Sequence, residues 1–452
     1  MQRIVRRSAE YKPTYQRFVL KKKSYTQQYS HIYVSRLLVL RDAVQRRLAP
    51  DQQAPLLPKI IDLRPGSDCI IVGTVLKVLE AKPDLFQSLT NDEKIVSLTT
   101  MDVHMATKTD QLILEDESGR VELIGDIDAG LYATGVVMGV RGRMIEGKNG
   151  FYVEEVFVPG LPPQPALPER GDSEYVALVS GLSIGRNNDA TPLKNHLLMD
   201  YLAGRVGNQE EKQFISQIVR TIVVGNSVDS DSAVTQPRNG VIQKKKTTEE
   251  LTLDAAPMRN LDELLSTLAS SMSVDVMPGE SDPSNHALPQ QSFHSCLFPR
   301  SARFASFRAV TNPYEAQVGN VAFLGHSGQP LKSLLQCTLP TDDQMVDEGK
   351  EDKGTTEHAL DCLERCLQWR HAAPTAPDLL TSFPIANDDP FVIESCPHVF
   401  FSGNAAKFGT RSIEGPNGQS VRLVLVPSFN ETSTVVLVDL KDLSCFPISI
   451  DL

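Results

Sequence analysis

Residues 274–285 have the sequence Val-Asp-Val-Met-Pro-Gly-Glu-Ser-Asp-Pro-Ser-Asn, which is the clearest indication of the chain's architecture. A β-branched run ends in Pro278-Gly279, and a loop rich in Asp, Ser and Asn follows. In α/β proteins a strand, a sharp turn and a polar loop in this order place side chains at the carboxyl edge of a sheet, where such folds keep their sites. The stretch therefore predicts a site at that edge.

Two further stretches have the same form. Residues 220–227 (Arg-Thr-Ile-Val-Val-Gly-Asn-Ser) and 399–404 (Val-Phe-Phe-Ser-Gly-Asn) each end an apolar run in Gly followed by Asn. We expect all three strands to belong to one sheet whose loops meet on one rim.

The bulk composition is that of an ordinary soluble globular protein. The chain has 452 residues, of which 41% are hydrophobic and 22% charged, and this length suffices for two or three domains. Its formal net charge of -11 argues against a general nucleic-acid binder. We find no secretory signal and no membrane span, and the seven scattered Cys form no C-x-x-C pair. We therefore expect reduced thiols and a cytosolic or nuclear compartment.

The N-terminal 50 residues are basic and contain only two acids, Glu10 and Asp42. Apolar residues recur at three- and four-residue spacing, which predicts a helix from about Tyr25 to Leu48. The apolar stripe consists of Tyr29, Tyr33, Leu37, Leu40, Val44 and Leu48. Four arginines fall mostly off this stripe, namely Arg36, Arg41, Arg46 and Arg47. We expect the helix to pack on its own domain with a solvated basic face, and a basic surface near DNA is the alternative.

Short strands with glycines at the bends follow, at 69–78, in a hairpin over 111–124, and at 136–143 and 150–156. This order is typical of a small OB-type barrel. OB barrels often bind single strands through aromatic side chains and a basic groove, but these strands carry few aromatics. The hairpin is instead acidic, with Glu115, Asp116, Glu117 and Glu122. We therefore favour protein contact by the barrel over DNA binding.

A Pro-rich connector separates the barrel from a region of alternating strands and helices. Tyr175 to Ser180 is an apolar run typical of a buried strand. Helices are predicted at 193–206, 260–272 and 359–370, and strands at 421–427 and 433–439, so this region is an α/β sandwich. The predicted domains are 1–55 (N-terminal), 56–160 (OB), 161–174 (connector) and 175–452 (α/β), with polar insertions at 228–250 and 338–358.

Seven short motifs follow one another through the chain. They are Leu178-Val179-Ser180-Gly181-Leu182, Val224-Gly225-Asn226-Ser227-Val228, Met277-Pro278-Gly279-Glu280-Ser281-Asp282-Pro283, Leu288-Pro289-Gln290-Gln291, Val310-Thr311-Asn312-Pro313-Tyr314, Ala373-Pro374-Thr375-Ala376-Pro377-Asp378 and Cys396-Pro397-His398-Val399-Phe400-Phe401-Ser402-Gly403-Asn404. In order and spacing they resemble the small, non-catalytic B subunits of the replicative DNA polymerases, from about residue 28 to the C-terminus. The resemblance implies an N-terminal helix and an OB-fold barrel packed on a four-layer α/β-β/α phosphodiesterase-like sandwich.

Catalytically active relatives of this second domain are metal-dependent nucleases with the motifs D-x-H, G-D, G-N-H-D, a further His and G-H-x-H, which hold two metal ions. The resemblance places Gly181 and Ser183 at the first Asp and His, and Asn226 at the Asp of G-D. Glu280 and Ser281 replace the Asn-His pair, which leaves Asp282 unchanged. Asn404 and Ala406 replace the two His of the last motif, and His371 is the candidate for the remaining His.

This set of residues is a poor one for metal ions. Gly and Ala offer no ligand, Ser offers a weak one, and most of the anionic charge is gone. We therefore predict a retained scaffold without catalytic residues, metal or cofactor. We expect Asp282 to accept hydrogen bonds from backbone amides of its own loop. His294, His371 and His398 are expected to be hydrogen-bonded structural residues.

The resemblance implies a nuclear scaffold in DNA replication and repair. The implied partners are the cysteine-rich C-terminal domain of a polymerase catalytic subunit and a third subunit that reaches the sliding clamp, with DNA contacted indirectly and no membrane. Two alternatives stay open. One is a metal-dependent phosphodiesterase with an unusual ligand set, and the other is a single-strand DNA-binding module that uses the OB barrel.

Overall fold

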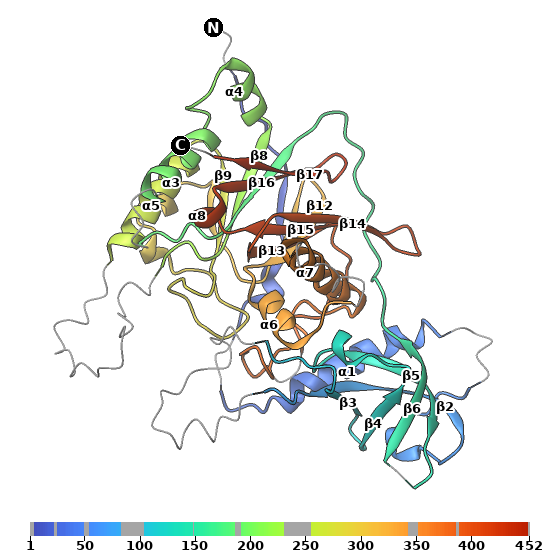
Figure 1. The fold of residues 1–452 in the computed structure, drawn as a ribbon. Helices are drawn as coiled ribbons and strands as arrows, with labels where there is room; N and C mark the ends of the chain where they lie inside the picture. Colours follow the sequence, from blue (N-terminus) through green and yellow to red (C-terminus); the bar gives the residue numbers. More distant parts are fainter. Residues whose placement is uncertain are drawn as a thin grey trace, which may run out of the picture.

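The computed structural model describes residues 4–21, 25–48, 54–82, 104–147, 149–185, 191–229, 255–341, 351–385 and 388–450. These ranges form a mixed α/β protein with a closed barrel and two larger sheets (Figure 1). In these ranges no helix combines the length and the apolar character that a membrane crossing requires.

Five strands form the barrel, in the order β2-β3-β4-β6-β5. Their bounds are Asp68–Val78 (β2), Gln111–Glu115 (β3), Arg120–Gly125 (β4), Val137–Met144 (β5) and Gly150–Phe157 (β6). Side chains alternate between the barrel interior and its surface, as Val121 and Leu123 of β4 show, since both are buried between exposed neighbours. The strands predicted from the sequence are confirmed to within one or two residues.

The first sheet has the order β10-β9-β8-β7-β16-β17. Its strands are Tyr175–Val179 (β7), Ile218–Val224 (β8), Ser273–Met277 (β9), Phe307–Ala309 (β10), Thr434–Asp439 (β16) and Cys445–Ser449 (β17). The second sheet has the order β1-β11-β12-β13-β15-β14. Its strands are Tyr11–Pro13 (β1), Tyr314–Val318 (β11), Val321–His326 (β12), Val399–Ala405 (β13), Gly409–Glu414 (β14) and Ser420–Pro427 (β15).

The prediction that the three loop-bearing strands share one sheet is wrong. β8 and β9 pair in parallel in the first sheet, but β13 lies in the second sheet between β12 and β15. An apolar run indicates a buried strand but carries no information on which sheet it joins. The two sheets nevertheless face each other, because side chains of both form one buried cluster that includes Val176, Ile222, Phe323 and Val424.

Helices cover the outer face of each sheet. On the first sheet Leu198, Leu261 and Leu265 pack with the strands, from helices that span Thr191–Leu202 (α3) and Ala256–Ala269 (α5). A short helix, Gln209–Ile215 (α4), precedes β8, and α8 (Phe429–Thr432) precedes β16. On the second sheet lie Gln329–Cys337 (α6) and Glu351–Gln368 (α7).

Both predicted insertions lie partly within the described ranges. The polar insertion at 338–358 stays a prediction, and α7 begins inside it, at Glu351. For the insertion at 228–250, Val228 is buried and bridges to Ile184, and the residues from 230 lie outside the described ranges.

The N-terminal segment contacts both sheets and the barrel. β1 pairs with β11 at the edge of the second sheet, and Arg6 donates hydrogen bonds to the Leu202 and Ile218 carbonyls of the first sheet's layer. The helix that follows, α1, spans Ser30–Gln45, and it buries Leu37, Leu40 and Val44 of the predicted stripe. The prediction of a solvated basic face fails for Arg36, which is fully buried.

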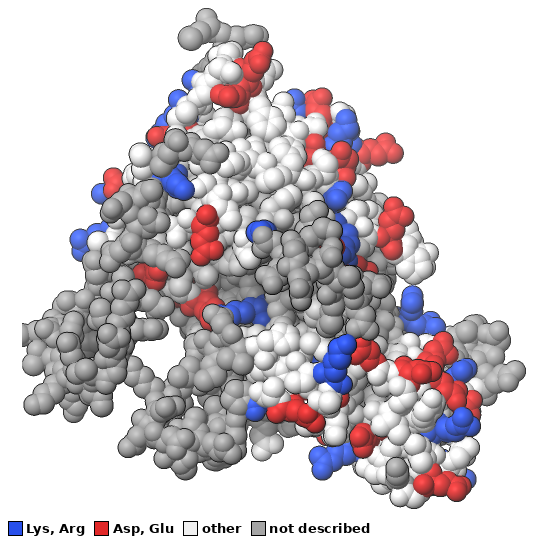
Figure 2. All heavy atoms as spheres, in the orientation of Figure 1, with Lys and Arg blue, Asp and Glu red and all other residues white. Residues whose placement is uncertain are grey.

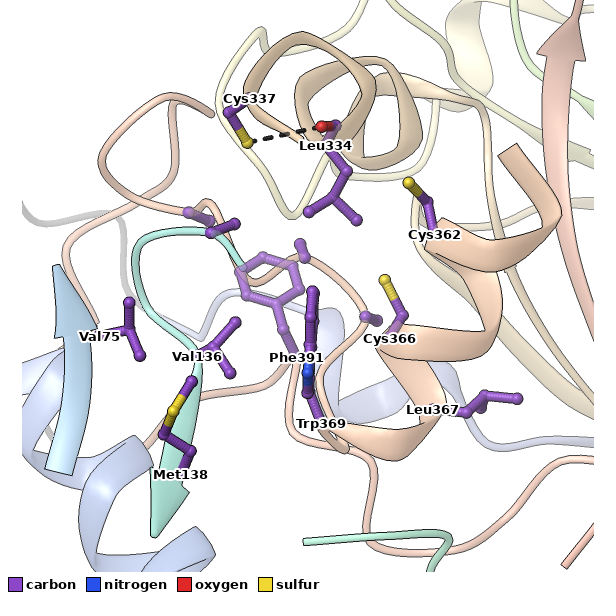
Figure 3. Close-up of a cluster of buried hydrophobic side chains, with 14 of the residues drawn as sticks. Val75, Val136, Met138, Leu334, Cys337, Cys362, Cys366, Leu367, Trp369 and Phe391 are labelled. Carbon is purple, nitrogen blue, oxygen red and sulfur yellow. Dashed lines mark hydrogen bonds between the residues drawn. The ribbon is translucent and has the colours of Figure 1, made fainter. Parts of the chain in front are cut away.

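The barrel and the second sheet share one hydrophobic core. Val75, Val136 and Met138 of the barrel region lie in the same buried cluster as Leu334 of α6 and Leu367 of α7 (Figure 3). The same cluster contains three buried thiols, Cys337, Cys362 and Cys366, and all seven Cys of the chain are free. A shared core of this kind resists movement of the barrel relative to the sheets.

Candidate functional site: a polar rim and a buried joint

The loops after β7, β8, β9 and β13 do meet on one rim, as the sequence predicts. The Gly181 N–H donates to the Gly225 carbonyl and the Ser183 N–H to the Asn226 carbonyl, each at 3.0 Å. A Cβ on Gly279 would clash with the Asn226 backbone, so the β8 and β9 loops are in direct contact. A Cβ on Gly403 would clash with Val224, which brings the β13 loop to the same place.

The rim asparagines bind the polypeptide backbone. The Asn404 side-chain amide donates to the Ser327 carbonyl at 2.7 Å, and the Asn226 Oδ1 accepts from the Ser281 N–H at 3.3 Å. Both asparagines have left-handed backbone angles, with φ of 53° at Asn404 and 52° at Asn226. Asn adopts left-handed backbone angles more readily than most residues, which is a structural reason for an asparagine at both positions.

Asp282 is the one former ligand position that still carries a carboxylate at the rim's centre. Its Oδ1 accepts the backbone N–H groups of Ser227 and Val228, both at 2.9 Å, and its Oδ2 accepts the Gly279 N–H at 2.8 Å. Burial raises the pKa of Asp282 to about 6, while the N–H donors oppose that rise. The predicted role in holding backbone amides is confirmed.

The remaining rim positions leave little room or charge for a ligand. A Cβ on Gly181, where φ is +64°, would lie 2.9 Å from the Asn404 Oδ1 and clash with the Ser428 hydroxyl. The Ser281 hydroxyl donates to the Val228 carbonyl at 2.7 Å. Glu280 and Ala406 are exposed.

His371 makes its contacts away from these loops. Its Nε2 lies 2.9 Å from the Asp389 carboxylate, and its backbone N–H donates to the Cys366 carbonyl. Burial, reinforced by the nearby Arg36 charge, lowers the pKa of His371 to about 4. The expectation that His371 is a hydrogen-bonded structural residue is confirmed. His294 and His398 likewise accept backbone N–H groups.

The imidazole that does lie at the rim is His326, which the sequence reasoning missed. It ends β12 and pairs in register with Ser402 of β13, and its Nδ1 accepts the Gly328 N–H at 3.2 Å. Its Nε2 is buried without a hydrogen-bond partner, and burial lowers its pKa to about 3. The signal was present in the sequence, because Gly325-His326-Ser327-Gly328 ends an apolar run as the three chosen loops do.

A cavity of about 410 Å³ adjoins the rim between α6, α7 and β13. Leu331 and Leu335 of α6 and Ala359 of α7 form its apolar wall, and Asn404 and Ala406 line the side toward the rim. Two lysines, Lys332 and Lys407, also line it. The wall that α6 and α7 give to this cavity is therefore mainly apolar.

The donor set does not fit a centre that holds two metal ions. Within the ranges that the structure describes, no group of three or more His, Cys, Asp and Glu side chains is arranged around a metal position. Hard divalent ions require several oxygen or imidazole ligands with free lone pairs. The centre of the rim supplies one carboxylate, that of Asp282, and backbone amides already occupy both of its oxygens.

Two buried cations lie at the joint between barrel and sheets, in addition to the buried Arg220–Asp275 pair within the first sheet. The Arg36 Nε donates to the Asp389 carboxylate at 2.7 Å, with both side chains buried. Its other nitrogens donate to the carbonyls of Gly135, Pro374 and Ala376. This one guanidinium thus ties α1, the barrel and the 374–389 loop region together. We call this group the Arg36 joint.

A second buried cation makes a similar link. The Lys77 ammonium of β2 donates to the Cys337 carbonyl at the end of α6 at 2.7 Å and lies 3.3 Å from the Asp110 carboxylate. Burial lowers the pKa of Lys77, and the nearby acidic groups oppose that change. The barrel is therefore fixed to the second sheet's helix layer at two separate points.

On the barrel surface, basic side chains are paired with acids. Arg141 lies 3.7 Å from both Glu154 and Glu155, and Arg143 lies 3.5 Å from Glu154. On the face seen in Figure 2, blue and red side chains of the described residues are interspersed over the barrel. Paired charges of this kind attract phosphate weakly.

Family models match both parts of the fold. The model for the OB-fold domain of the DNA polymerase delta subunit matches residues 28–156, and the model for the B subunit of DNA polymerase alpha/epsilon matches residues 176–410. The class of protein that the barrel, the two sheets and the degenerate rim define is the small, B-type accessory subunit of a DNA polymerase.

Relatives narrow this class further. The DNA polymerase delta small subunit of Arabidopsis thaliana is 39% identical over 98% of this chain and 96% of its own length. That of Saccharomyces cerevisiae is 32% identical over 96% of this chain and 91% of its own length. The DNA polymerase II small subunit of Pyrococcus horikoshii is 23% identical over 67% of this chain and 46% of its own length. The chain belongs to the family of DNA polymerase delta small subunits.

Proposed function

We propose that this chain is a non-catalytic scaffold of DNA polymerase delta in the nucleus, active in DNA replication and repair. In this role it bridges the cysteine-rich C-terminal domain of the catalytic subunit to a third subunit that reaches the sliding clamp. It contacts DNA through the complex. Family membership supports the accessory role, and the resemblance of the seven motifs supports the choice of partners.

The hydrogen bonding of Asp282 is the main support for a non-catalytic role. A catalytic carboxylate in a two-metal centre needs lone pairs free for the metals. Here three backbone N–H groups occupy the Asp282 oxygens, and the Asn226 and Asn404 amides bind backbone as well. The side chains at the former ligand positions hold the loops to one another, so the rim acts as structural support.

The Arg36 joint supports the scaffold part. A bridge between subunits transmits position only if its own parts do not move relative to each other. The shared hydrophobic core and the two buried cations provide that rigidity. Apolar burial supplies the stabilising free energy, and the buried ion pairs fix one relative orientation.

We further propose the domain division 1–55, 56–160, 161–174 and 175–452, with the last domain a four-layer phosphodiesterase-like sandwich. The order of helices, first sheet, second sheet and helices supports this architecture. Within residues 1–55, β1 joins the second sheet and α1 packs on the barrel, so this N-terminal region contacts both of the other domains.

A nuclease assay tests the absence of catalysis. The purified full chain is incubated with single- and double-stranded DNA and Mn²⁺, with and without chelator. The matched variant is Asn404→Ala, which removes an amide from the rim without touching Asp282. We expect no cleavage that depends on Mn²⁺. Cleavage that the chelator abolishes and Asn404→Ala weakens would establish the phosphodiesterase alternative.

Affinity purification with identification of the co-purifying proteins tests the scaffold. We expect the catalytic subunit and the further accessory subunits of a delta-type polymerase to be recovered together. If neither the catalytic subunit nor another accessory subunit is recovered, the bridging role is contradicted. Tight, salt-sensitive binding of single-stranded DNA by the isolated chain would favour the alternative OB function.

A further inference from the structure

Four strands form the margins of the two sheets, namely β1, β10, β14 and β17 (Figure 1). Exposed margin strands can pair with another chain, and short length or a proline prevents this. β1 and β10 have three residues each, and β1 ends in Pro13. β17 has five residues with Pro447 in the middle, and proline has no N–H to donate. β14 has six residues and no proline, so it lacks both protections.

The outer side of β14 presents backbone groups without partners. On its inner side β14 pairs antiparallel with β15. The Gly415 N–H, directly after β14, donates to the Gln419 carbonyl at 2.8 Å, and in an antiparallel pair only alternate residues exchange such bonds. Thr410, Ser412 and Glu414 therefore direct their N–H and C=O groups away from the sheet. Among the residues that the structure describes, none forms a hydrogen bond with these outward groups.

An acidic stripe of α7 lies along β14. The Arg411 guanidinium of β14 contacts three carboxylates of α7, those of Glu357 at 2.6 Å, Asp361 at 2.7 Å and Glu364 at 3.0 Å. Residues with this spacing of four and three lie on one face of a helix. One guanidinium cannot balance three carboxylates, and the Glu357 side chain is 54% exposed. The surface beside β14 is therefore negative on the side of α7.

We propose that β14 pairs with an extended segment of another polymerase subunit, which adds one strand to the second sheet and carries Lys or Arg at alternate positions. The outward groups of Thr410, Ser412 and Glu414 bind the backbone of the segment. Alternate side chains of a strand lie on the same face, so the basic residues meet the acidic stripe of α7. Six residues at about 3.4 Å each offer an edge of roughly 20 Å. This surface rests on the proposed scaffold function.

The charge of the stripe disfavours two other occupants. In a second copy of this chain, two β14 strands would pair antiparallel about a twofold axis, which places the same face of each sheet on one side. The acidic stripes of both α7 helices would then adjoin, and like charges repel. Nucleic acid is disfavoured for the same reason, because its phosphates are anionic.

Amide hydrogen exchange of the full chain, alone and assembled with the catalytic and third subunits, tests the proposal. We expect the outward N–H groups of Thr410, Ser412 and Glu414 to exchange at least about tenfold more slowly in the complex, because the added strand accepts their hydrogen bonds. The edge of β17, interrupted by Pro447, is the matched control and is expected to keep its exchange rate. This measurement requires no substitution.

Substitutions at the edge separate the backbone contribution from the side chains. Ser412→Pro removes one outward N–H that β15 does not use, and Ser412→Ala keeps that N–H and removes only the hydroxyl. We expect Ser412→Pro to weaken retention of the partner segment by about tenfold and Ser412→Ala to leave it unchanged. Circular dichroism verifies that each variant is folded.

A crosslink and a charge reversal identify the segment. The photo-crosslinking residue p-benzoylphenylalanine at position 412 keeps the N–H and is expected to capture a segment with Lys or Arg at alternate positions. Glu357→Lys is expected to reduce this crosslink about threefold, and Glu substitutions of the captured basic residues are expected to restore it. Glu122→Lys, on the exposed side of β4, is the charge control.

The outcomes separate this surface from the scaffold function. Unchanged exchange of β14 in an assembled complex overturns the strand pairing and leaves the scaffold intact. Equal retention by folded Ser412→Pro and Ser412→Ala, or a crosslink to DNA or to a second copy of this chain, does the same. Failure of the unmodified chain to assemble with either subunit overturns the scaffold function and the surface with it.

Discussion

The rim and the Arg36 joint are both buried polar regions, but they use their polar groups differently. At the rim one carboxylate is held by backbone amides, and asparagine and glycine occupy the positions around it. At the joint a guanidinium, a carboxylate and an imidazole are completely enclosed and satisfy one another. Burial of a charged side chain costs desolvation free energy, so the positions of buried charges indicate where the structure depends on their partners.

The difference indicates that the molecule keeps its buried charge for rigidity. Metal-dependent catalysis would require the anionic side chains at the rim, where only Asp282 is left and its oxygens are occupied. The paired charges at the joint instead specify one orientation of α1, the barrel and the second sheet. This fixed orientation is what the proposed scaffold function requires.

The largest effect is expected from the joint. Arg36→Ala leaves the Asp389 carboxylate buried without its cationic partner, although His371 still contacts it, and such a loss typically costs about 3–5 kcal/mol of the free energy of unfolding. Arg46→Ala on the exposed face of the same helix is the control and is expected to change it by less than about 0.5 kcal/mol. Chemical denaturation of both variants measures the difference. Equal stabilities would show that the joint carries no special role.

Asp282→Ala should have a slightly smaller effect. It leaves the N–H groups of Ser227, Val228 and Gly279 buried without an acceptor, at a cost of about 3 kcal/mol. Glu280→Gln, two residues away and exposed, is the matched control. Denaturation midpoints compare the two variants. If Asp282→Ala is as stable as the control, the carboxylate does not hold the loops.

A moderate effect is expected at Gly181. Alanine there must adopt a left-handed backbone angle and clash with Ser428, so Gly181→Ala is expected to destabilise the fold by about 2 kcal/mol. Gly171→Ala is the control, because a Cβ at Gly171 meets nothing within 4 Å. Thermal unfolding distinguishes them. A neutral Gly181→Ala would mean that this position still has room for a ligand side chain.

The smallest effect is expected for the pH dependence of the free energy of unfolding. Burial, with the nearby Arg365 charge, lowers the pKa of His358 to about 4, below its value in the unfolded chain. The unfolded chain therefore binds more protons between about pH 4 and 6.5, and stability falls as pH falls through that window. His358→Met should remove about 1 kcal/mol of the loss between pH 7.5 and 5.5. An unchanged pH dependence of the unfolding free energy would contradict the lowered pKa.

Much of the fold was accessible from the sequence. The barrel strands were predicted closely because β3 and β4 alternate buried and exposed residues, β2 and β5 are bounded apolar runs, and the Ser118-Gly119 turn marks the hairpin. The loops of the rim were found because Gly and Asn follow strands at each one. The distribution of the strands over two sheets could not be predicted, because a single apolar run does not show which strand it pairs with.

Two positions show where sequence reasoning fails. Arg36 lies beside the predicted apolar stripe of α1, and only the folded chain reveals that Asp389 and three carbonyls accept hydrogen bonds from its guanidinium. The second position is the histidine of the rim. His326 is the last residue of a strand and His371 follows the end of a helix, and the sequence alone does not show how far either lies from the rim. The choice between them required the pairing of β12 with β13.

Titration of the purified full chain with Mn²⁺ in a calorimeter shows whether the rim binds metal ions. If the rim side chains serve only to hold loops together, no saturable heat with two ions per chain will be observed. Saturable binding of two Mn²⁺ ions that is lost in both Asn226→Ala and Asn404→Ala would mean that the rim is a metal site.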